Sequence, residues 1–270
     1  MKVDKSRENS PRISSLPFVH DPLSLPFPEG ATQRLLGLDM DSVSRSAFLT
    51  TIPFIFDSAR DEIKWLREGQ GWYQALSGIA NGRQVLFVKT QVGASNVLDC
   101  LCFLRICGVE VIVFVGLCGG LLSGADHGDL FMPGEVVRLD LVSEVVATRK
   151  YPAAPDTTLS QRLSHLVGTC PDVALRSTGP LASLTALCQE TTEVLQMLRD
   201  DGVDGVDLES AAFLTACSIW GIRAVSLLVV SDRPLDGDYL IADDKPSKKC
   251  LDSARSLTSL LLSNANDVFR

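Results

Sequence analysis

Three short segments each place glycines or acidic side chains directly after an apolar run, and each could contact a ligand. The first segment, residues 116–120, reads Gly-Leu-Cys-Gly-Gly and follows the apolar residues 109–115. Because glycine has no Cβ and tolerates positive φ, a ligand could approach the backbone closely there. A tight turn is the simpler explanation of a glycine cluster. The segment matches neither the GxGxxG dinucleotide motif nor the Gly-Lys-Ser/Thr of a phosphate-binding loop.

The second segment, 206–212, reads Val-Asp-Leu-Glu-Ser-Ala-Ala and places two carboxylates between an apolar strand and an apolar helix. Asp207 or Glu209 could simply cap that helix. Glu209 precedes a very apolar stretch, however, so its carboxylate is expected at the edge of the core, where a glutamate needs a partner. Two neighbouring hydroxyl groups, as on a sugar, would suit it, since a carboxylate can accept two hydrogen bonds at once.

The third segment, 231–237, reads Ser-Asp-Arg-Pro-Leu-Asp-Gly and follows the apolar run 223–230. Asp232 thus stands at the end of a buried strand, where a charge is unfavourable unless it has a use. A turn in which Asp232 pairs with Arg233 is an equally simple explanation on local grounds. The occurrence of all three segments at strand ends favours one shared site over three unrelated turns.

The elements that must position these segments alternate along the chain. Strands are predicted at 84–90, 109–115, 129–139, 173–177, 203–207 and 223–230, and helices at 95–107, 159–167, 190–200, 210–220 and 247–265. Alternation of this kind predicts a single-domain α/β fold with a mixed, mainly parallel twisted sheet flanked by helices. Active sites in such sheets gather at the carboxyl ends of the strands, where the three segments lie.

Composition narrows the class of protein. A net charge of −8 argues against binding of a nucleic acid polymer. The cysteines lie mostly in apolar runs, there is no CxxC, and the histidines are scattered, so we expect free thiols, no metal site and a reducing, cytoplasmic location. No signal peptide or apolar stretch long enough for a membrane is present. The domain prediction is a loose Pro-rich arm at 1–30 followed by a catalytic domain at 31–270.

Together the segments resemble the nucleoside phosphorylase and nucleosidase superfamily, which includes purine nucleoside phosphorylase, methylthioadenosine nucleosidase and AMP nucleosidase. The resemblance covers residues 70–265, and its motifs arrive in family order. Residues 93–96 and 231–237 are most similar to the catalytic half of AMP nucleosidases, which have Gly-Pro-Ser-Asn and Ser-Asp-Lys-Pro-Leu-His-Gly there. The other matching segments are 116–120, 128–129, 206–210 and 230–232.

The resemblance implies a reaction that breaks the bond between a ribose and its base, without a cofactor. Asp232 would donate a proton to the leaving base, which near neutral pH requires burial to raise its pKa well above ~3.9. Glu209 would bind ribose hydroxyls, close to the positive charge that develops on the sugar. The other implied contacts are Leu208 and Gly93 at the ribose, Ser183, Thr185 and Leu187 at the base, and Gly116, Cys118, Gly119 and Gly120 along the sugar side.

Several positions depart from the family pattern. Phosphorylases of this group hold phosphate with an Arg and a Ser around the glycine segment, where this chain has Phe114 and Leu117. Water is therefore predicted as the nucleophile, which gives a nucleosidase acting on a purine-type nucleoside or nucleotide. Leu187 or Cys188 stands where the family has a ring that stacks on the base. Leu122 replaces an Arg of AMP nucleosidases, which disfavours a 5′-phosphate on the substrate.

Two alternatives stay open. One is a purine nucleoside phosphorylase whose anion site is rebuilt from Arg45 or from an Arg of another subunit. The other is a paralogue that binds a nucleoside without turnover. The resemblance also implies a homo-oligomer, for which residues 48–56 (FLTTIPFIF) are either interface material or an ordinary core segment.

Overall fold

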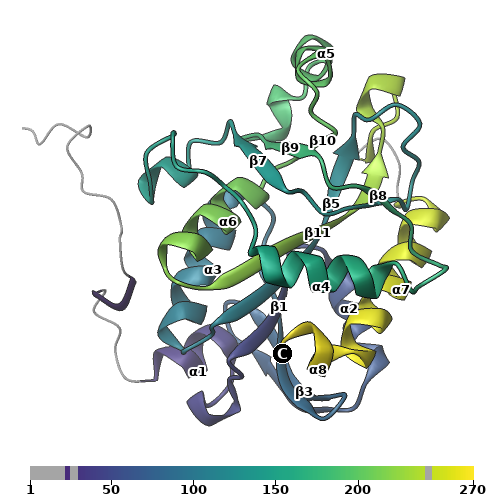
Figure 1. Ribbon diagram of the computed structural model, residues 1–270. Coiled ribbons are helices and arrows are strands. Elements are labelled where there is room, and N and C mark those ends of the chain that lie inside the picture. Colours follow the sequence, from purple (N-terminus) through teal and green to yellow (C-terminus); the bar gives the residue numbers. More distant parts are fainter. Residues whose placement is uncertain (1–21, 25–29, 241–244) are drawn as a thin grey trace, which may run out of the picture.

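The computed structural model describes residues 22–24, 30–240 and 245–270. Almost all of the expected arm at 1–30 lies outside these residues. Within them the chain forms one sheet of 11 strands with helices on both faces (Figure 1). The predicted single-domain α/β fold with a mixed, mainly parallel sheet is confirmed. In the described part, no helix combines the length and the apolar character needed to cross a lipid bilayer.

The sheet runs in the order β2-β3-β4-β1-β5-β10-β9-β7, while β11 pairs with β5 and β6, and β8 pairs with β6. The strands are β1 Ser46–Thr50, β2 Trp65–Gln70, β3 Gln74–Ala80, β4 Arg83–Lys89, β5 Val111–Gly120, β6 Leu130–Phe131, β7 Glu135–Arg138, β8 Leu175–Ser177, β9 Pro180–Ser183, β10 Gly205–Asp207 and β11 Arg223–Asp232. The central strands β1, β5 and β11 are parallel to one another, so their carboxyl ends meet at one edge.

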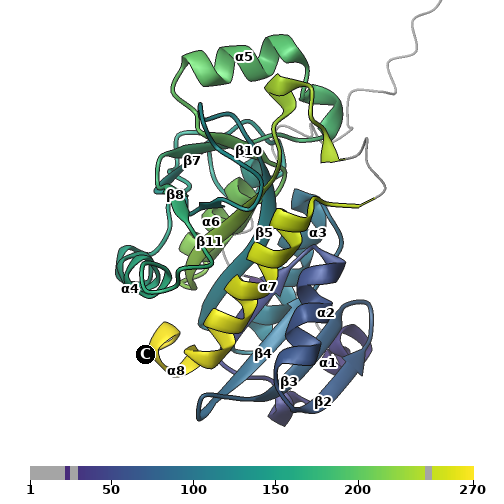
Figure 2. The same ribbon diagram turned by 90° about the vertical axis from the view of Figure 1, so that its right-hand side faces the viewer.

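Two layers of helices cover the sheet, as Figure 1 and the turned view in Figure 2 show. On one face α3 packs against α6, and the rings of Phe114 and Phe213 lie 5.3 Å apart. On the other, α2 packs against α7, and the rings of Phe48 and Phe269 lie 4.8 Å apart. The helices are α1 Ala31–Leu36, α2 Pro53–Glu62, α3 Ala94–Ile106, α4 Thr157–Val167, α5 Thr192–Asp200, α6 Ser210–Ile219, α7 Lys248–Ser263 and α8 Ala265–Val268.

Residues 116–120, predicted as a loop after a strand, are instead the second half of β5. The strand continues because β11 pairs with it along its whole length, with Val229 beside Leu117 and Val230 beside Cys118. Gly120 is also paired, with Gly205 of the antiparallel strand β10. The glycines therefore lie in a strand that is paired on both sides, not in a turn.

Other boundaries also differ from the sequence prediction. The single strand expected at 129–139 is divided into β6 and β7 around Pro133-Gly134, since proline cannot donate to a sheet ladder. The strands β1, β2 and β3 and the helix α2 were not predicted. Residues 48–56 belong to β1 and α2, with Phe48 and Phe56 fully or almost fully buried, so the core explanation of this segment holds.

Candidate functional site

A cavity of about 440 Å³ lies at the carboxyl ends of β1, β5, β10 and β11. Each of these strands contributes its last residues or the residues that follow it, which is where ligands bind in sheets of this kind. The loop between β9 and α5 and the segment after β11 close the remaining sides. The lining residues are Thr51, Ile52, Val92, Leu117, Cys118, Gly119, Leu187, Glu190, Val206, Asp207, Leu208, Glu209, Ser231, Asp232, Tyr239 and Leu240.

Glu209 reaches the cavity from the turn between β10 and α6, where it is the N-cap residue and only 6% exposed. Its Oε1 accepts a hydrogen bond of 2.7 Å from the backbone N–H of Gly93, the N-cap of α3. Burial raises the pKa of Glu209, and the neighbouring Asp207 carboxylate raises it further. The backbone N–H groups of Gly93 and Leu208 lower the pKa, and the hydrogen bond from Gly93 goes to Oε1, which leaves Oε2 able to accept from a ligand.

Asp207 lines the same cavity, but both of its oxygens are used within the protein. Oδ1 accepts a hydrogen bond of 2.5 Å from the hydroxyl of Ser183, and Oδ2 accepts one of 2.9 Å from the N–H of Ser210. Burial raises the pKa of Asp207, while these hydrogen bonds lower it. Asp207 therefore stabilises the turn that positions Glu209, and Asp207 also caps α6. The sequence alone did not decide whether Asp207 or Glu209 has this structural role.

Asp232 ends β11 and is 8% exposed. Its Oδ1 accepts a hydrogen bond of 2.6 Å from the hydroxyl of Ser231, and its Oδ2 accepts one of 3.1 Å from the N–H of Leu240. The register of β11 against β5 shifts between Val230 and Asp232, a bulge of the kind that redirects side chains beside active sites. Burial raises the pKa of Asp232, the direction that a proton donor near neutral pH requires.

Glu190 is a fourth carboxyl in the cavity, and it was not predicted as a site residue. It follows the short 3-10 helix Leu187–Gln189, in the loop that leaves β9. Burial raises its pKa to about 7, helped by the charges of Asp232 and Asp207. Because β9 and β10 are parallel, the loop after β9 reaches the same edge of the sheet, a signal that could have revealed Glu190.

The predicted base contacts are only partly brought together. Leu187 lines the cavity and is 50% exposed. Ser183 does not line it, because its buried hydroxyl donates to Asp207 and accepts from the N–H of Ala211 at 2.8 Å. Thr185 is exposed outside the lining, and its hydroxyl lies 3.5 Å from the carbonyl oxygen of Leu139.

The predicted sugar contacts also divide into two groups. Leu208, Cys118 and Gly119 line the cavity, whereas Gly116 and Gly120 lie within β5 outside the lining. Gly93 acts through its N–H, which holds Glu209, rather than by lining the cavity itself. The structure therefore brings Asp232, Glu209 and part of each expected contact set to one place.

The cavity is acidic. Four carboxyl groups line it, and the lining contributed by the described residues includes no Lys, Arg or His. Arg45, the intrachain candidate for an anion site, precedes β1 and forms an ion pair with Glu110. The cavity begins at Thr51, beyond the other end of that strand, roughly 20 Å away at about 3.3 Å per residue. Arg45 therefore does not reach the cavity of its own chain.

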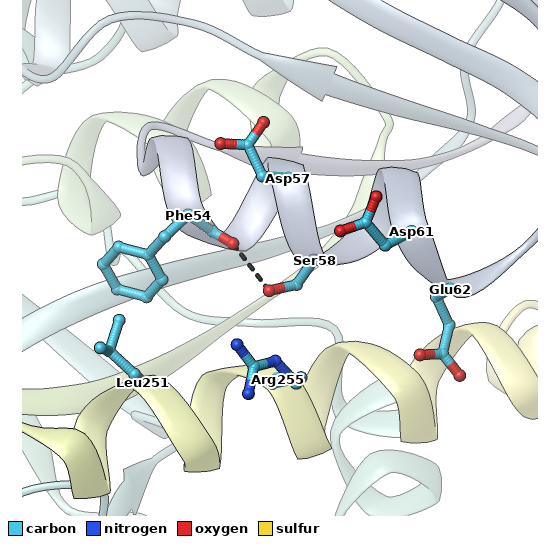
Figure 3. A pocket seen from close by; sticks show the side chains of 7 residues that line it. All are labelled: Phe54, Asp57, Ser58, Asp61, Glu62, Leu251 and Arg255. Atoms are coloured by element: carbon cyan, nitrogen blue, oxygen red, sulfur yellow. Dashed lines mark hydrogen bonds between the residues drawn. The ribbon is translucent and has the colours of Figure 1, made fainter.

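Two other cavities contain no predicted site residue. One, of about 240 Å³, lies between α2 and α7, where Figure 3 shows Glu62 directed toward the helix that carries Arg255. The other, of about 390 Å³, lies beside α7 near His127. Neither lies at the shared carboxyl edge of the central strands β1, β5 and β11, so the 440 Å³ cavity is the candidate site.

Comparison with known proteins identifies the family of the chain. Residues 46–264 match the family model described as the phosphorylase superfamily. The uridine phosphorylases of Klebsiella aerogenes and Escherichia coli (strain K12) are each 23% identical over 211 residues, which cover 73% of this chain and 78% of theirs.

Solved structures share the fold. The uridine phosphorylase of Vibrio fischeri ES114 superposes with a TM-score of 0.75 at 20% identity, covering 89% of this chain and all of that one (100%). The purine nucleoside phosphorylase of Toxoplasma gondii, in complex with immucillin-H, gives a TM-score of 0.72 at 17% identity, covering 84% and 92%. At these identities the structural likeness establishes the fold alone.

Proposed function

We propose that this chain, which belongs to the phosphorylase superfamily, cleaves the N-glycosidic bond of an uncharged nucleoside. The observation that carries the proposal is the meeting of Glu209 and Asp232 in one cavity at the carboxyl ends of the central strands. Each has a raised pKa caused first by burial. Carboxyl groups perturbed in this way inside a cleft are typical of functional sites.

The proposed roles follow from the position and the surroundings of each carboxyl. Glu209 holds the ribose, since Gly93 donates to Oε1 and Oε2 can accept hydrogen bonds from sugar hydroxyls. Asp232 donates a proton to a base nitrogen while the C1′–N bond breaks and its electron pair leaves with the base. The sugar then carries positive charge, which nearby carboxylates stabilise. Leu187, Leu208 and Cys118 provide apolar walls for the base and the sugar.

Water is the proposed nucleophile. A phosphate ion needs cationic or N–H donors, and the described lining offers four carboxyls and no cationic side chain. A water molecule can attack C1′ and release its proton to solvent, which yields free ribose and the free base. The same acidity supports a nucleoside rather than a nucleotide as the substrate.

Phosphorolysis is the second candidate, favoured by the names of the relatives, which are uridine and purine nucleoside phosphorylases. It would require an anion site completed by an arginine of a neighbouring subunit. A homo-oligomer is part of either proposal and can be measured by light scattering. The free state of all eight cysteines supports a reducing compartment such as the cytoplasm.

A nucleoside panel tests the proposal. Purine nucleosides come first, because residues 231–237 resemble the AMP nucleosidase segment, and pyrimidine nucleosides follow because of the uridine phosphorylase relatives. Each reaction is run with and without phosphate, and the sugar product is identified by chromatography. Free ribose at a rate independent of phosphate supports the hydrolase. Ribose 1-phosphate establishes phosphorolysis instead, and tight binding without any product, unchanged in Asp232→Asn, indicates a binding paralogue.

A further inference from the structure

Residues 233–240, the strap, follow β11 and fold back on its last residue, Asp232. Two backbone hydrogen bonds between Arg233 and Asp238, with N···O distances of 3.1 and 3.3 Å, close the strap into a loop. Its last residue, Leu240, donates its N–H to Oδ2 of Asp232 at 3.1 Å and lines the cavity. The strap therefore forms part of the cavity wall and holds one oxygen of the proposed proton donor.

The side chain of His127 joins the strap to the loop between β5 and β6. Its Nε2 lies 2.5 Å from Oδ2 of Asp238, although the two residues are 111 positions apart in the sequence. The side chains of His127 and Asp238 are only 18% and 27% exposed, so water competes weakly for this hydrogen bond. Within the strap, Arg233 lies farther from the same oxygen, with its Nε at 3.8 Å. A shielded hydrogen bond to a carboxylate is strong enough to hold two distant segments together.

The loop that carries His127 is itself fixed to the sheet and to α7. Gly128 donates its N–H to the carbonyl oxygen of Val230 at 2.9 Å, and Val230 donates back to the loop at 2.8 Å. A Cβ on Gly128 would lie 2.8 Å from the carbonyl oxygen of Lys249, which shows how closely the loop packs on α7. Lys249 also forms an ion pair with Asp126. His127 therefore extends from a firmly held loop toward the strap.

The His127–Asp238 pair lies close enough to Asp232 to act on its charge. Burial is the first cause of the raised pKa of Asp232, the charge of Asp238 raises this pKa further, and His127 lowers it. Neither His127 nor Asp238 belongs to the cavity lining contributed by the described residues. The pair can therefore influence a reaction in the cavity through the strap and Asp232, and not by touching a substrate.

We propose that His127 and Asp238 are positioning residues, which hold the strap so that Leu240 keeps the carboxyl of Asp232 directed at the leaving base. This inference rests on the proposed function, because it takes Asp232 to be the proton donor. Without the pair, the strap loses its hydrogen bond to the loop between β5 and β6, and the carboxyl can turn away from the base. A catalytic group misplaced by about 1 Å can cost about a hundredfold in rate.

Hydrogen exchange tests the hold on the strap without any need for turnover. In His127→Leu and in Asp238→Ala, the amides of residues 233–240 should exchange at least about tenfold faster than in the wild type, as mass spectrometry of peptides can measure. The amides of β1, Ser46–Thr50, should keep their protection, which shows that the variants are folded. Should His127→Leu lose protection in β1 as well, the comparison of Asp238→Ala with its control decides alone.

That control is Asp236→Ala. Asp236 belongs to the strap and pairs with Arg233 at 3.5 Å, as Asp238 does at 3.8 Å, but Asp236 does not bond to His127. Asp236→Ala should therefore leave the exchange of the strap unchanged. His127→Gln should restore most of the protection that His127→Leu loses, because the glutamine amide can place an N–H donor near the position of Nε2.

Turnover tests what the strap does for Asp232. In His127→Leu and Asp238→Ala, kcat on a nucleoside should fall about ten- to a hundredfold, and His127→Gln should recover most of this loss. A nitrophenyl riboside has a leaving group that needs no proton, so its turnover should stay within about threefold of wild type in all of these variants. This difference between the substrates distinguishes a misplaced proton donor from a damaged cavity.

Exchange of the strap at the wild-type rate in both His127→Leu and Asp238→Ala overturns the inference, and so does equal acceleration in Asp236→Ala. An equal loss of turnover on both substrates also overturns it, since the pair would then only maintain the shape of the cavity. If the wild-type protein cleaves no nucleoside, the proposed catalysis fails. Faster exchange in His127→Leu and Asp238→Ala would still establish that the pair holds the strap.

Discussion

Replacing Asp232 by Asn removes the proposed proton donor while keeping every hydrogen bond around it. The amide oxygen can take the N–H of Leu240, which Oδ2 accepts at 3.1 Å. The amide NH₂ can donate to the hydroxyl of Ser231, which lies 2.6 Å from Oδ1 and can still donate to the carbonyl oxygen of Cys118 at 3.2 Å. No buried polar group loses its partner, so we expect the free energy of unfolding to change by less than about 1 kcal/mol.

Turnover should respond differently from stability. General acid catalysis contributes about 10²- to 10⁴-fold, so kcat of Asp232→Asn should fall by that factor, or about 2.7–5.4 kcal/mol in activation free energy. The acid must be protonated, and burial raises its pKa. Wild-type kcat should therefore decrease as pH rises through that raised pKa, and the variant should lack this decrease. Steady-state kinetics across pH, with urea unfolding of both proteins, measures the two effects.

A substrate with an acidic leaving group separates a proton donor from a residue that merely shapes the cavity. Nitrophenyl riboside needs no proton on its leaving group, so Asp232→Asn should lose much less activity on it than on a nucleoside. Asp236→Asn is the control, because this exposed carboxylate belongs to the neighbouring 3-10 helix Pro234–Asp236, outside the cavity lining. Retention of nucleoside turnover within tenfold of wild type, with the same pH dependence, would refute the role of Asp232.

Three further substitutions test other parts of the site. Glu209→Gln keeps an acceptor for the N–H of Gly93 but removes the charge that the carboxylate carries above its raised pKa of about 8, so kcat/KM at pH 9 should fall about 10²- to 10³-fold in steady-state kinetics; a smaller loss than tenfold at that pH would contradict the ribose contact. Glu190→Gln should raise Tm at pH 8 and leave it nearly unchanged at pH 5, as calorimetry can show. The pKa of this carboxyl rises from 4.5 to about 7 on folding, so wild-type stability declines as pH increases across that interval. Equal changes in Tm at pH 5 and pH 8 would show that the raised pKa of Glu190 is not the cause. Gly116→Ala would place a Cβ 2.7 Å from the ring of Phe114 and should cost about 1–3 kcal/mol in urea unfolding without changing KM, whereas unaltered stability would show that the ring can move aside.

The sequence was informative where apolar character and strand ends coincide. Residues 109–115 and 223–230 are apolar on both faces, which only a central, doubly covered strand satisfies, and β5 and β11 are such strands. Because parallel strands end at the same edge, the residues that follow β5 and β11 converge, and this rule brings Asp232 to the cavity. Glu209 reaches the same cavity from β10, which is antiparallel to β5, so its place there does not follow from that rule.

Patterns of this kind do not predict which side chains form hydrogen bonds with one another. Ser183 is a polar residue in the expected loop, but its hydroxyl is required by Asp207 and the start of α6. Glu190 was read as the beginning of a helix, although the helix begins at Thr192 and Glu190 remains in the loop facing the cavity. Hydrogen bonds between distant segments decide which of two nearby polar residues faces a ligand. A local sequence pattern does not contain information on those hydrogen bonds.

The acidity of the cavity makes a last prediction about charged substrates. At about 8 Å and an effective dielectric constant of about 20, two like unit charges repel by about 2 kcal/mol, or about thirtyfold in kcat/KM, and a phosphate dianion at least doubles that cost. Since the described lining offers four carboxyls and no cationic side chain, the 5′-monophosphate of the best nucleoside should react at least about a hundredfold more slowly than the nucleoside. Added salt should narrow the difference by screening the repulsion. Equal kcat/KM for both at low salt would mean that a cation from outside this lining reaches the cavity, and the argument for water over phosphate as the nucleophile would then fail as well.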